Sequence, residues 1–179
     1  YPRPYVSRQL TAEIVGRIDA LGRERVPLAE RDVRSAVDML QRRGVRAIAV
    51  CFLWSTLNPS HELRARNIIH EMWPEVPVTL SHELNPIPRE YRRAISTAID
   101  ASLHPIVGAY TKALADALEK KGFDTDHFLI ATCTGGMMPP NALVAKPIFS
   151  VMSGPTLAPV AAQHLTNEPD VVVVDMGGT

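Results

Sequence analysis

The sequence has little cysteine, no long hydrophobic run and no excess of either charge, and each lack excludes a class of protein. Cys51 and Cys133 are the only cysteines in 179 residues, which excludes a disulfide scaffold and a cysteine zinc cluster. No apolar run approaches the roughly 20 residues of a membrane helix, and no signal-peptide pattern opens the chain. These absences favour a cytoplasmic location.

Charge is also balanced, with 19 Lys and Arg against 19 Asp and Glu. No overall field therefore draws the protein to nucleic acid or to an anionic membrane. All of the arginines lie between Arg3 and Arg93, so the first half is mildly basic. This asymmetry fits either a basic binding face or a solvated surface with interspersed signs.

Apolar periodicity and turn residues predict alternating helices and strands. Helices are expected over about 29–43, 59–73 and 155–165, and strands over 45–54, 76–81, 127–133, 147–152 and 171–175. A helical pattern from Pro88 to Lys121 contains Pro105, which removes a hydrogen bond, so we expect two helices there. Residues 1–28 fit either a short helix capped by Thr11 or two strands meeting near Asp19. The fold class is α/β, with a mostly parallel sheet and helices on both faces.

The chain ends in VVVVDMGGT, an apolar strand pattern followed by Asp175, Gly177, Gly178 and Thr179. Ligands of α/β sheets bind at the carboxyl ends of the strands. Glycines let a phosphate approach backbone N–H groups, and Asp175 is suited to hold Mg²⁺ through water or to orient a nucleophile. The alternative is an ordinary Gly-Gly turn after a strand, without a ligand. For such a short pattern this is about as frequent as a phosphate-binding turn.

Two further glycine turns follow predicted strands. Thr134 precedes Gly135 and Gly136, and Ser153-Gly154-Pro155 precedes a predicted helix whose free N–H groups suit an anion. A capped helix without a ligand is the alternative for the second. If all three strands are parallel, the three turns open on one edge of the sheet. Their convergence is what predicts a phosphate-binding site.

A charged segment at 81–93, SHELNPIPREYRR, surrounds two prolines. Candidate contacts to substrate or to another subunit are His82, Glu83, Arg89, Glu90 and Arg93. Arg89 and Arg93 are spaced to share a helix face and clamp a carboxylate, with a solvated helix start as the alternative. The histidines lack metal-ligand spacing, and neither Ser153 nor Cys133 lies in a nucleophile elbow.

The order of these motifs resembles the hydantoinase A/oxoprolinase family from about Arg25 to Thr179. The segments that carry the resemblance are AVCFLWSTLNPSHE, SHELNPIPREYRRAISTAIDASLHPIV, TGG, SGP and DMGGT. SGPT-x-AP and the HELNPI-x-REYRR run resemble the acetone and acetophenone carboxylase branch more than the oxoprolinases. The resemblance favours two strands over a helix in residues 1–24.

The resemblance implies an incomplete ribonuclease-H-like architecture of the actin-like ATPase type. Residues 1–85 would end the first domain, and 86–179 would begin the hydantoinase A domain, cut at its phosphate loop. The implied cofactors are ATP and Mg²⁺, the implied substrates a cyclic amide or a ketone plus bicarbonate, and the implied partner a hydantoinase B-type subunit. Asp175 would be the catalytic residue and the three glycine turns would hold phosphate. The competing class is a non-catalytic interaction module that binds a partner through its Arg-rich first half.

Overall fold

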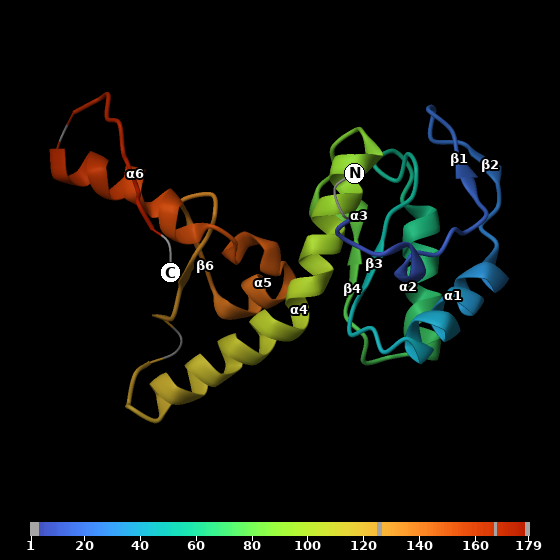
Figure 1. The fold of residues 1–179 in the computed structure, drawn as a ribbon, viewed down its shortest axis with the longest axis horizontal. Coiled ribbons are helices and arrows are strands. Elements are labelled where there is room, and N and C mark those ends of the chain that lie inside the picture. Colours follow the sequence, from blue (N-terminus) through green and yellow to red (C-terminus); the bar gives the residue numbers. More distant parts are fainter. Residues whose placement is uncertain (1–3, 125–126, 167, 178–179) are drawn as a thin grey trace. The chain divides into compact units, whose positions relative to one another are not determined.

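The computed structural model describes residues 4–124, 127–166 and 168–177 (Figure 1). The chain divides into two compact units, Tyr1–Pro105 (unit 1) and Ile106–Thr179 (unit 2). The sequence-based division at 85/86 rests on family resemblance rather than on spatial compactness, and it stays a prediction. None of the described helices is long and apolar enough to cross a membrane.

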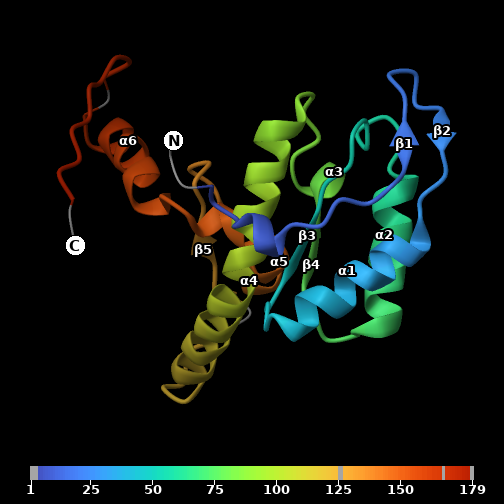
Figure 2. The ribbon, with the colours of Figure 1, turned by 45° about the vertical axis from the view of Figure 1, so that its right-hand side comes forward.

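Unit 1 is built around a pair of parallel strands, β3 (Ile48–Val50) and β4 (Val78–Leu80), with Ile48 opposite Val78. Helices α1 (Glu30–Arg42) and α2 (Ser60–Met72) lie on one face of the pair, and the first half of α4 (Glu90–Glu119) lies on the other (Figure 2). The helices at 29–43 and 59–73 are confirmed. The α/β class with helices on both faces is confirmed as well, although the strands are shorter than predicted.

Apolar residues from both strands and from α1 and α2 form the core of unit 1. Its buried members are Val33, Val37, Ile48, Val50, Ala65, Ile68, Ile69, Val76 and Leu80. The helices begin and end where the local sequence dictates. The Asn58 side chain accepts the Ser60 N–H at 3.1 Å at the start of α2, and Gly44, at φ +68°, follows the end of α1.

Residues 17–26 form the two-stranded alternative rather than a helix. β1 (Arg17–Ile18) pairs antiparallel with β2 (Glu24–Val26). The turn between them is organised by Asp19, whose carboxylate accepts the Leu21 and Arg23 backbone N–H groups and the Arg23 and Arg25 side chains. The Arg23 backbone hydrogen bond and the other donors hold the pKa of Asp19 well below its usual range. A short 3₁₀ turn, η1 (Arg8–Leu10), precedes the hairpin.

α4 is one helix of 30 residues with Pro105 inside it, so the prediction of two helices is wrong. A proline in a helix interior deletes a single backbone hydrogen bond, and the turns on either side retain theirs. Glu90 is its first residue. A four-residue helix, α3 (Ser81–Leu84), directly follows β4.

Unit 2 contains a hairpin of β5 (Ile130–Ala131) and β6 (Met137–Met138), then α5 (Pro140–Ala145), a 3₁₀ turn η3 (Pro147–Ser150) and α6 (Ser153–Thr166). The helix at 155–165 is confirmed, two residues longer at its start. The strand predicted at 147–152 is wrong, because Pro147 opens a turn closed locally by Phe149 N–H to Lys146 O and Val151 N–H to Ile148 O.

Residues 171–177 form no strand, which contradicts the expectation for 171–175. Val172 and Val174 are 92% and 79% exposed, and no strand in the described part of unit 2 offers backbone partners to this apolar segment. β-branched residues favour a strand only when a neighbour completes the ladder.

Candidate functional site

The Thr134-Gly135-Gly136 segment is the turn of the β5–β6 hairpin. β5 and β6 are antiparallel, and Thr132 N–H donates to Gly136 O at 2.9 Å across the turn. Gly135 has φ +78°, a left-handed conformation that disfavours a side chain. Gly136 is exposed beside it. The segment is therefore a Gly-Gly turn at the end of a strand, as predicted, but it belongs to a hairpin and not to a parallel sheet.

The start of α6 lies against this turn. Thr156 Oγ1 is 3.2 Å from Thr132 O and 2.9 Å from Ser153 O, and a side chain at Gly135 would reach Val160 of the helix. Ser153 is half-buried and Gly154 exposed, with open space where its side chain would be. The first-turn N–H groups of a helix lack intrahelical acceptors. Two of the three predicted phosphate segments thus meet within unit 2.

The third segment is described only in part. Asp175 and Gly177 are exposed, and a Cβ at Gly177 would lie 4.0 Å from an Asp175 carboxylate oxygen. Gly178 and Thr179 lie outside the described residues. Because Ser153-Gly154 follows η3 and Asp175 follows no strand, the expectation that three parallel strands deliver these turns to one sheet edge is wrong.

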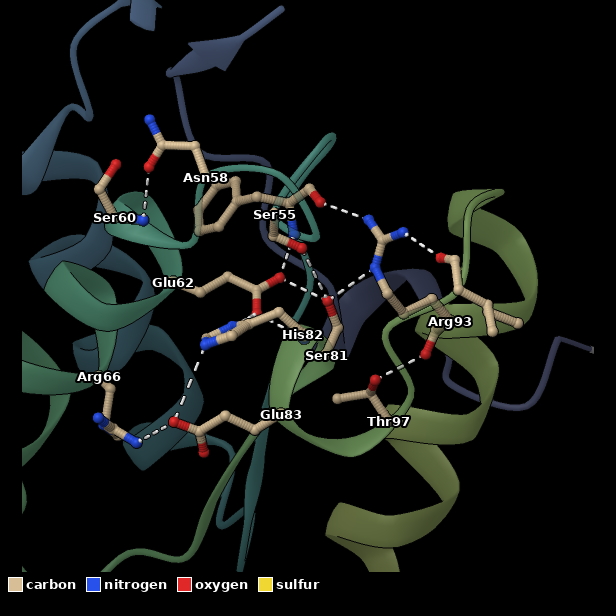
Figure 3. A network of polar contacts seen from close by, with 12 residues as sticks. Ser55, Asn58, Ser60, Glu62, Arg66, Ser81, His82, Glu83, Arg93 and Thr97 are labelled. Carbon is tan, nitrogen blue, oxygen red and sulfur yellow. Dashed lines mark hydrogen bonds and ion pairs between the residues drawn. The ribbon is translucent and has the colours of Figure 1, made fainter. Parts of the chain in front are cut away.

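Unit 1 contains a second polar site, at the carboxyl ends of β3 and β4 (Figure 3). Its centre is Glu62 of α2, which is fully buried. The carboxylate accepts four hydrogen bonds: from Phe52 N–H at 2.9 Å, Ser81 Oγ at 2.5 Å, His82 N–H at 3.1 Å and His82 Nδ1 at 2.7 Å. Burial raises the pKa of Glu62, but the donors outweigh it and hold the pKa below its ordinary value. Glu62 is therefore a buried carboxylate anion.

Arg93 lies on the other side of Ser81 and is 1% exposed. Its Nε donates to Ser81 Oγ at 2.9 Å, and its two terminal nitrogens donate to Ile87 O at 3.0 Å and Phe52 O at 2.6 Å. Arg93 was expected to lie at the surface and contact substrate or another subunit. Its side chain is instead buried inside unit 1. It ties the segment after β3 to the segment before α4.

The other residues predicted in 81–93 are placed differently from one another. The His82 side chain is 14% exposed, with Nε2 3.9 Å from Glu83 Oε1, and Glu83 also pairs with Arg66 at 2.8 Å. Arg89 is exposed at φ +75° and lies outside α4, so the expected helical clamp of Arg89 and Arg93 does not form. Glu90 is half-buried at the helix start.

Sequence reasoning missed Glu62 and Ser81. Glu62 shares the buried stripe of α2 with Ala65 and Ile69, three and seven residues on, and this spacing is the signal that marks an inward-facing carboxylate. It also missed a buried cluster in which Thr79 Oγ1 donates to Asp100 Oδ2 at 2.8 Å and lies 3.2 Å from His104 Nε2. That cluster fastens β4 to α4.

Cys51 and Cys133 are half-buried free thiols. Burial raises the pKa of Cys51, although Ser81 and Arg93 lie close enough to oppose the shift. A thiol held neutral is a poor nucleophile. No group of three metal-ligating side chains occurs in the described part of the chain.

Comparisons with known proteins match almost the whole chain. Residues 1–73 match the family model described as "Hydantoinase/oxoprolinase N-terminal region", and residues 93–179 match the one described as "Hydantoinase/oxoprolinase". The caprolactamase subunit alpha of Pseudomonas jessenii is 35% identical over 97% of this chain and 25% of its own length. The acetophenone carboxylase gamma subunit of Aromatoleum aromaticum is 36% identical over 99% of this chain and 25% of its own length.

Solved structures give the same result. The crystal structure of the ATP-dependent caprolactamase from Pseudomonas jessenii superposes with a TM-score of 0.91 and 35% identity, over 100% of this chain and 26% of its own. The nucleotide-free structure of acetone carboxylase gives 0.78 and 25% identity, over 93% of this chain and 24% of its own. These matches confirm the actin-like ATPase type of architecture. The chain spans about a quarter of the length of these relatives.

Proposed function

Because the chain belongs to the hydantoinase/oxoprolinase family, we propose that it forms part of an ATP-dependent enzyme that activates a carbonyl group by phosphoryl transfer. The substrate is either a cyclic amide, which is opened, or a ketone, which is carboxylated with bicarbonate. The observation that carries the proposal is the packing of the glycine turn at 134–136 against the start of α6. Relatives named caprolactamase and acetophenone carboxylase support both substrate classes.

The branch of the family is a second part of the proposal. The SGPT-x-AP motif at residues 153–159 favours a ketone carboxylase. The near-equal identities to caprolactamase and to acetophenone carboxylase, 35% and 36%, do not separate the two branches. Both relatives are named as subunits, which supports a partner subunit, and the resemblance to the family implies that this partner is of the hydantoinase B type.

ATP binding in this proposal relies on backbone groups. Gly136 is exposed on the hairpin turn, Gly154 has open space beside it, and the N–H groups that open α6 at Ser153 and Gly154 carry the positive end of the helix dipole. Gly177 and, beyond the described residues, Gly178 and Thr179 supply further donors. Phosphoryl transfer needs this positioning and charge neutralisation more than it needs a protein nucleophile.

Asp175 fits a role toward Mg²⁺. Mg²⁺ in ATP-using sites is bound through one or two carboxylates together with waters and phosphate oxygens. A single exposed aspartate beside glycines is consistent with this mode of coordination. An all-protein cage does not fit, because the described residues contain no group of three ligands. When bound, the ion would neutralise charge on the phosphates.

The alternative, an interaction module that binds through its arginines, has less support. Arg93 is buried, and Arg23, Arg25, Arg34, Arg64 and Arg66 are paired with carboxylates of the same chain. The Glu30 partner raises the pKa of Arg64, as expected of a committed ion pair. These six of the fifteen arginines are engaged within the chain, which reduces the number available for a partner.

The test is ATP-dependent turnover by the complete protein that contains these residues, together with its partner subunit. ADP formation would be followed with 5-oxoproline, hydantoins, caprolactam, and acetone or acetophenone plus bicarbonate. Turnover of one of these classes is expected. Absence of ATP-dependent turnover with all of them would refute the proposal.

Replacing Asp175 tests the phosphate site directly. We expect Asp175→Ala to lower ATP turnover by at least about 100-fold without unfolding the protein, because it removes a charge-positioning group. Asp170→Ala, at another exposed aspartate nearby in the sequence, is the control and should retain wild-type turnover. Near-wild-type rates in Asp175→Ala would show that the assignment is wrong.

A further inference from the structure

The glycine turn at 134–136 carries two threonine hydroxyls in addition to its backbone groups. Thr132, directly after β5, is 2% exposed, and Thr134, inside the turn, is exposed. Their Oγ1 atoms lie 2.8 Å apart, and Thr132 Oγ1 also lies 3.2 Å from Gly136 O. All of these atoms belong to unit 2, so their arrangement does not depend on unit 1.

The direction of these hydrogen bonds follows from the number of hydrogens. Each hydroxyl has one hydrogen and the Gly136 carbonyl oxygen has none, so Thr132 Oγ1 donates to Gly136 O. Thr132 then has no hydrogen left for Thr134, and the 2.8 Å contact between the hydroxyls requires Thr134 to donate. The result is a chain from the Thr134 O–H through the Thr132 O–H to the carbonyl, in which both contacts are satisfied.

This hydrogen-bond chain decides what Thr134 can bind. Its hydrogen points inward to Thr132, so the exposed side of its oxygen carries lone pairs alone. Such an oxygen accepts hydrogen bonds and repels a phosphate oxygen, which is also an acceptor. The first-turn N–H groups of α6 have the opposite polarity and suit phosphate. Thr156 Oγ1, 3.2 Å from Thr132 O, keeps the helix start against the turn, so unit 2 offers donors and an acceptor together.

Gly136 leaves the two hydroxyls open to a ligand. A Cβ at this position would lie 3.8 Å from Thr132 Oγ1 and 3.9 Å from Thr134 Oγ1, so a side chain here would cover the pair. Gly136 is itself exposed, and its φ lies outside the left-handed region that Gly135 adopts. An alanine would therefore fit the backbone at 136, but it would fill the space beside the hydroxyls.

ATP that carries Mg²⁺ is a ligand with both polarities. Its phosphate oxygens accept hydrogen bonds, and Mg²⁺ in ATP-using sites keeps several waters, whose hydrogens point away from the ion. We infer that the Thr134 hydroxyl accepts a hydrogen bond from a water of the Mg²⁺ hydration shell, while backbone N–H groups hold the phosphate. Thr134 then selects Mg·ATP over metal-free ATP, and Thr132 is a positioning residue that acts through it. The inference rests on the proposed function, because it names the form of ATP that the same turn prefers.

The test compares ATP binding with and without Mg²⁺ in the complete protein together with its partner subunit. Titration calorimetry gives the dissociation constants of Mg·ATP and of ATP in EDTA. Thr134→Val keeps the branched shape and removes the hydroxyl. We expect it to weaken binding of Mg·ATP by about tenfold and to leave metal-free ATP unchanged, because only the hydrated ion uses the acceptor. Thr134→Ser should keep both wild-type constants.

Thr132→Val tests the positioning role. Loss of the Thr132 hydroxyl frees the Thr134 hydrogen to donate to a phosphate oxygen, so the preference for Mg·ATP over metal-free ATP should fall by about threefold or more. Gly136 O still accepts the Thr132 N–H at 2.9 Å, so the hairpin keeps a hydrogen bond across its turn. Thr166→Val is the control and should keep both constants, because this exposed hydroxyl bonds to Ala162 O of its own helix.

A substitution outside the two threonines covers the case in which those variants do not fold. Gly136→Ala places a methyl group beside both hydroxyls without straining the backbone. We expect it to lower the preference for Mg·ATP over metal-free ATP. An unchanged preference would overturn the inference.

The outcomes separate this inference from the proposed function. Wild-type protein that binds neither form of ATP refutes the proposed function. Wild-type protein that binds both forms equally refutes the inference alone. If Thr134→Val weakens both forms by the same factor, Thr134 donates to phosphate and the inferred polarity is wrong. Unchanged constants in Thr134→Val would show that the hydroxyl contacts neither the ion's waters nor the phosphate.

Discussion

Ser81 joins two opposite charges that unit 1 keeps out of water. Its hydroxyl donates to Glu62 and accepts from Arg93, so the anion and the cation are bridged by one small side chain. Each charge also binds the backbone of Phe52, the anion through its N–H and the cation through its carbonyl. Removing either charge leaves the other buried without its balance, which is a large cost in a folded protein.

Arg93→Lys should destabilise the chain although the charge is kept. A lysine ammonium cannot reproduce the planar fork that reaches Ser81, Ile87 and Phe52, so at least one buried carbonyl loses its donor. We expect a loss of about 2 to 4 kcal/mol in urea unfolding. The neighbouring exposed Arg92→Lys should stay within about 0.5 kcal/mol. Equal stabilities of the two variants would contradict the buried role.

The lowered pKa of Glu62 predicts a pH dependence of stability. A carboxyl whose pKa is lower in the folded state than in the unfolded state stabilises the fold above its unfolded pKa, ordinarily 4.5. That contribution is lost as the pH falls through the folded value. Glu62→Gln should therefore be less stable than wild type at pH 7. The difference in free energy of unfolding between the two proteins should become smaller below pH 4.5.

Urea midpoints at neutral and acidic pH would measure this gap. Glu75→Gln, at an exposed glutamate, is the control and should track the wild type at each pH. A gap between wild type and Glu62→Gln that is constant across the acidic range would contradict the prediction.

At the scale of elements, helices were more predictable than strands. The repeats of Val33, Val37 and Leu40 marked α1 because a helix satisfies its own backbone and only needs an apolar stripe. Strand predictions at 147–152 and 171–175 failed because apolar β-branched runs carry no information on whether a pairing partner exists. In the first case Pro147 favoured a local turn.

Gly44 tests the end of α1. Its φ of +68° strains any residue with a side chain, although nothing lies within 4 Å of the position that a Cβ would take. Gly44→Ala should therefore cost about 1 kcal/mol through backbone strain alone. Gly154→Ala has the same open space without the positive φ, and it should stay within about 0.5 kcal/mol. Thermal or urea unfolding of both variants checks the difference.

At the scale of the whole molecule, the sequence predicted the family and the glycine turns, but not the secondary-structure elements that carry these turns. The segments at 134–136 and 153–156 do meet, but through Thr156, which reaches back to Thr132, and not along one edge of a parallel sheet as expected. The interior role of Arg93 was not predictable, since an arginine between charged neighbours usually lies at the surface. Long-range packing decides such burial, and one sequence does not record it.

Residues 1–179 alone should bind ATP weakly. Phosphate-binding enzymes of this kind surround the nucleotide with several loops, and this chain spans about a quarter of the length of its relatives. Titration calorimetry of this chain should give a dissociation constant no tighter than about 1 mM. A micromolar constant would show that the described turns suffice for binding.

β3 has a further consequence for handling these residues as an isolated polypeptide. In the part of unit 1 that the structure describes, it pairs with β4 on one side, and no strand lies along its other side. Ala49, in its middle, is exposed and small, and it offers neither charge nor bulk to block another chain. Such an edge is a template for intermolecular pairing. Association of the isolated polypeptide should therefore begin at this edge. It should increase with protein concentration even where the core stays folded.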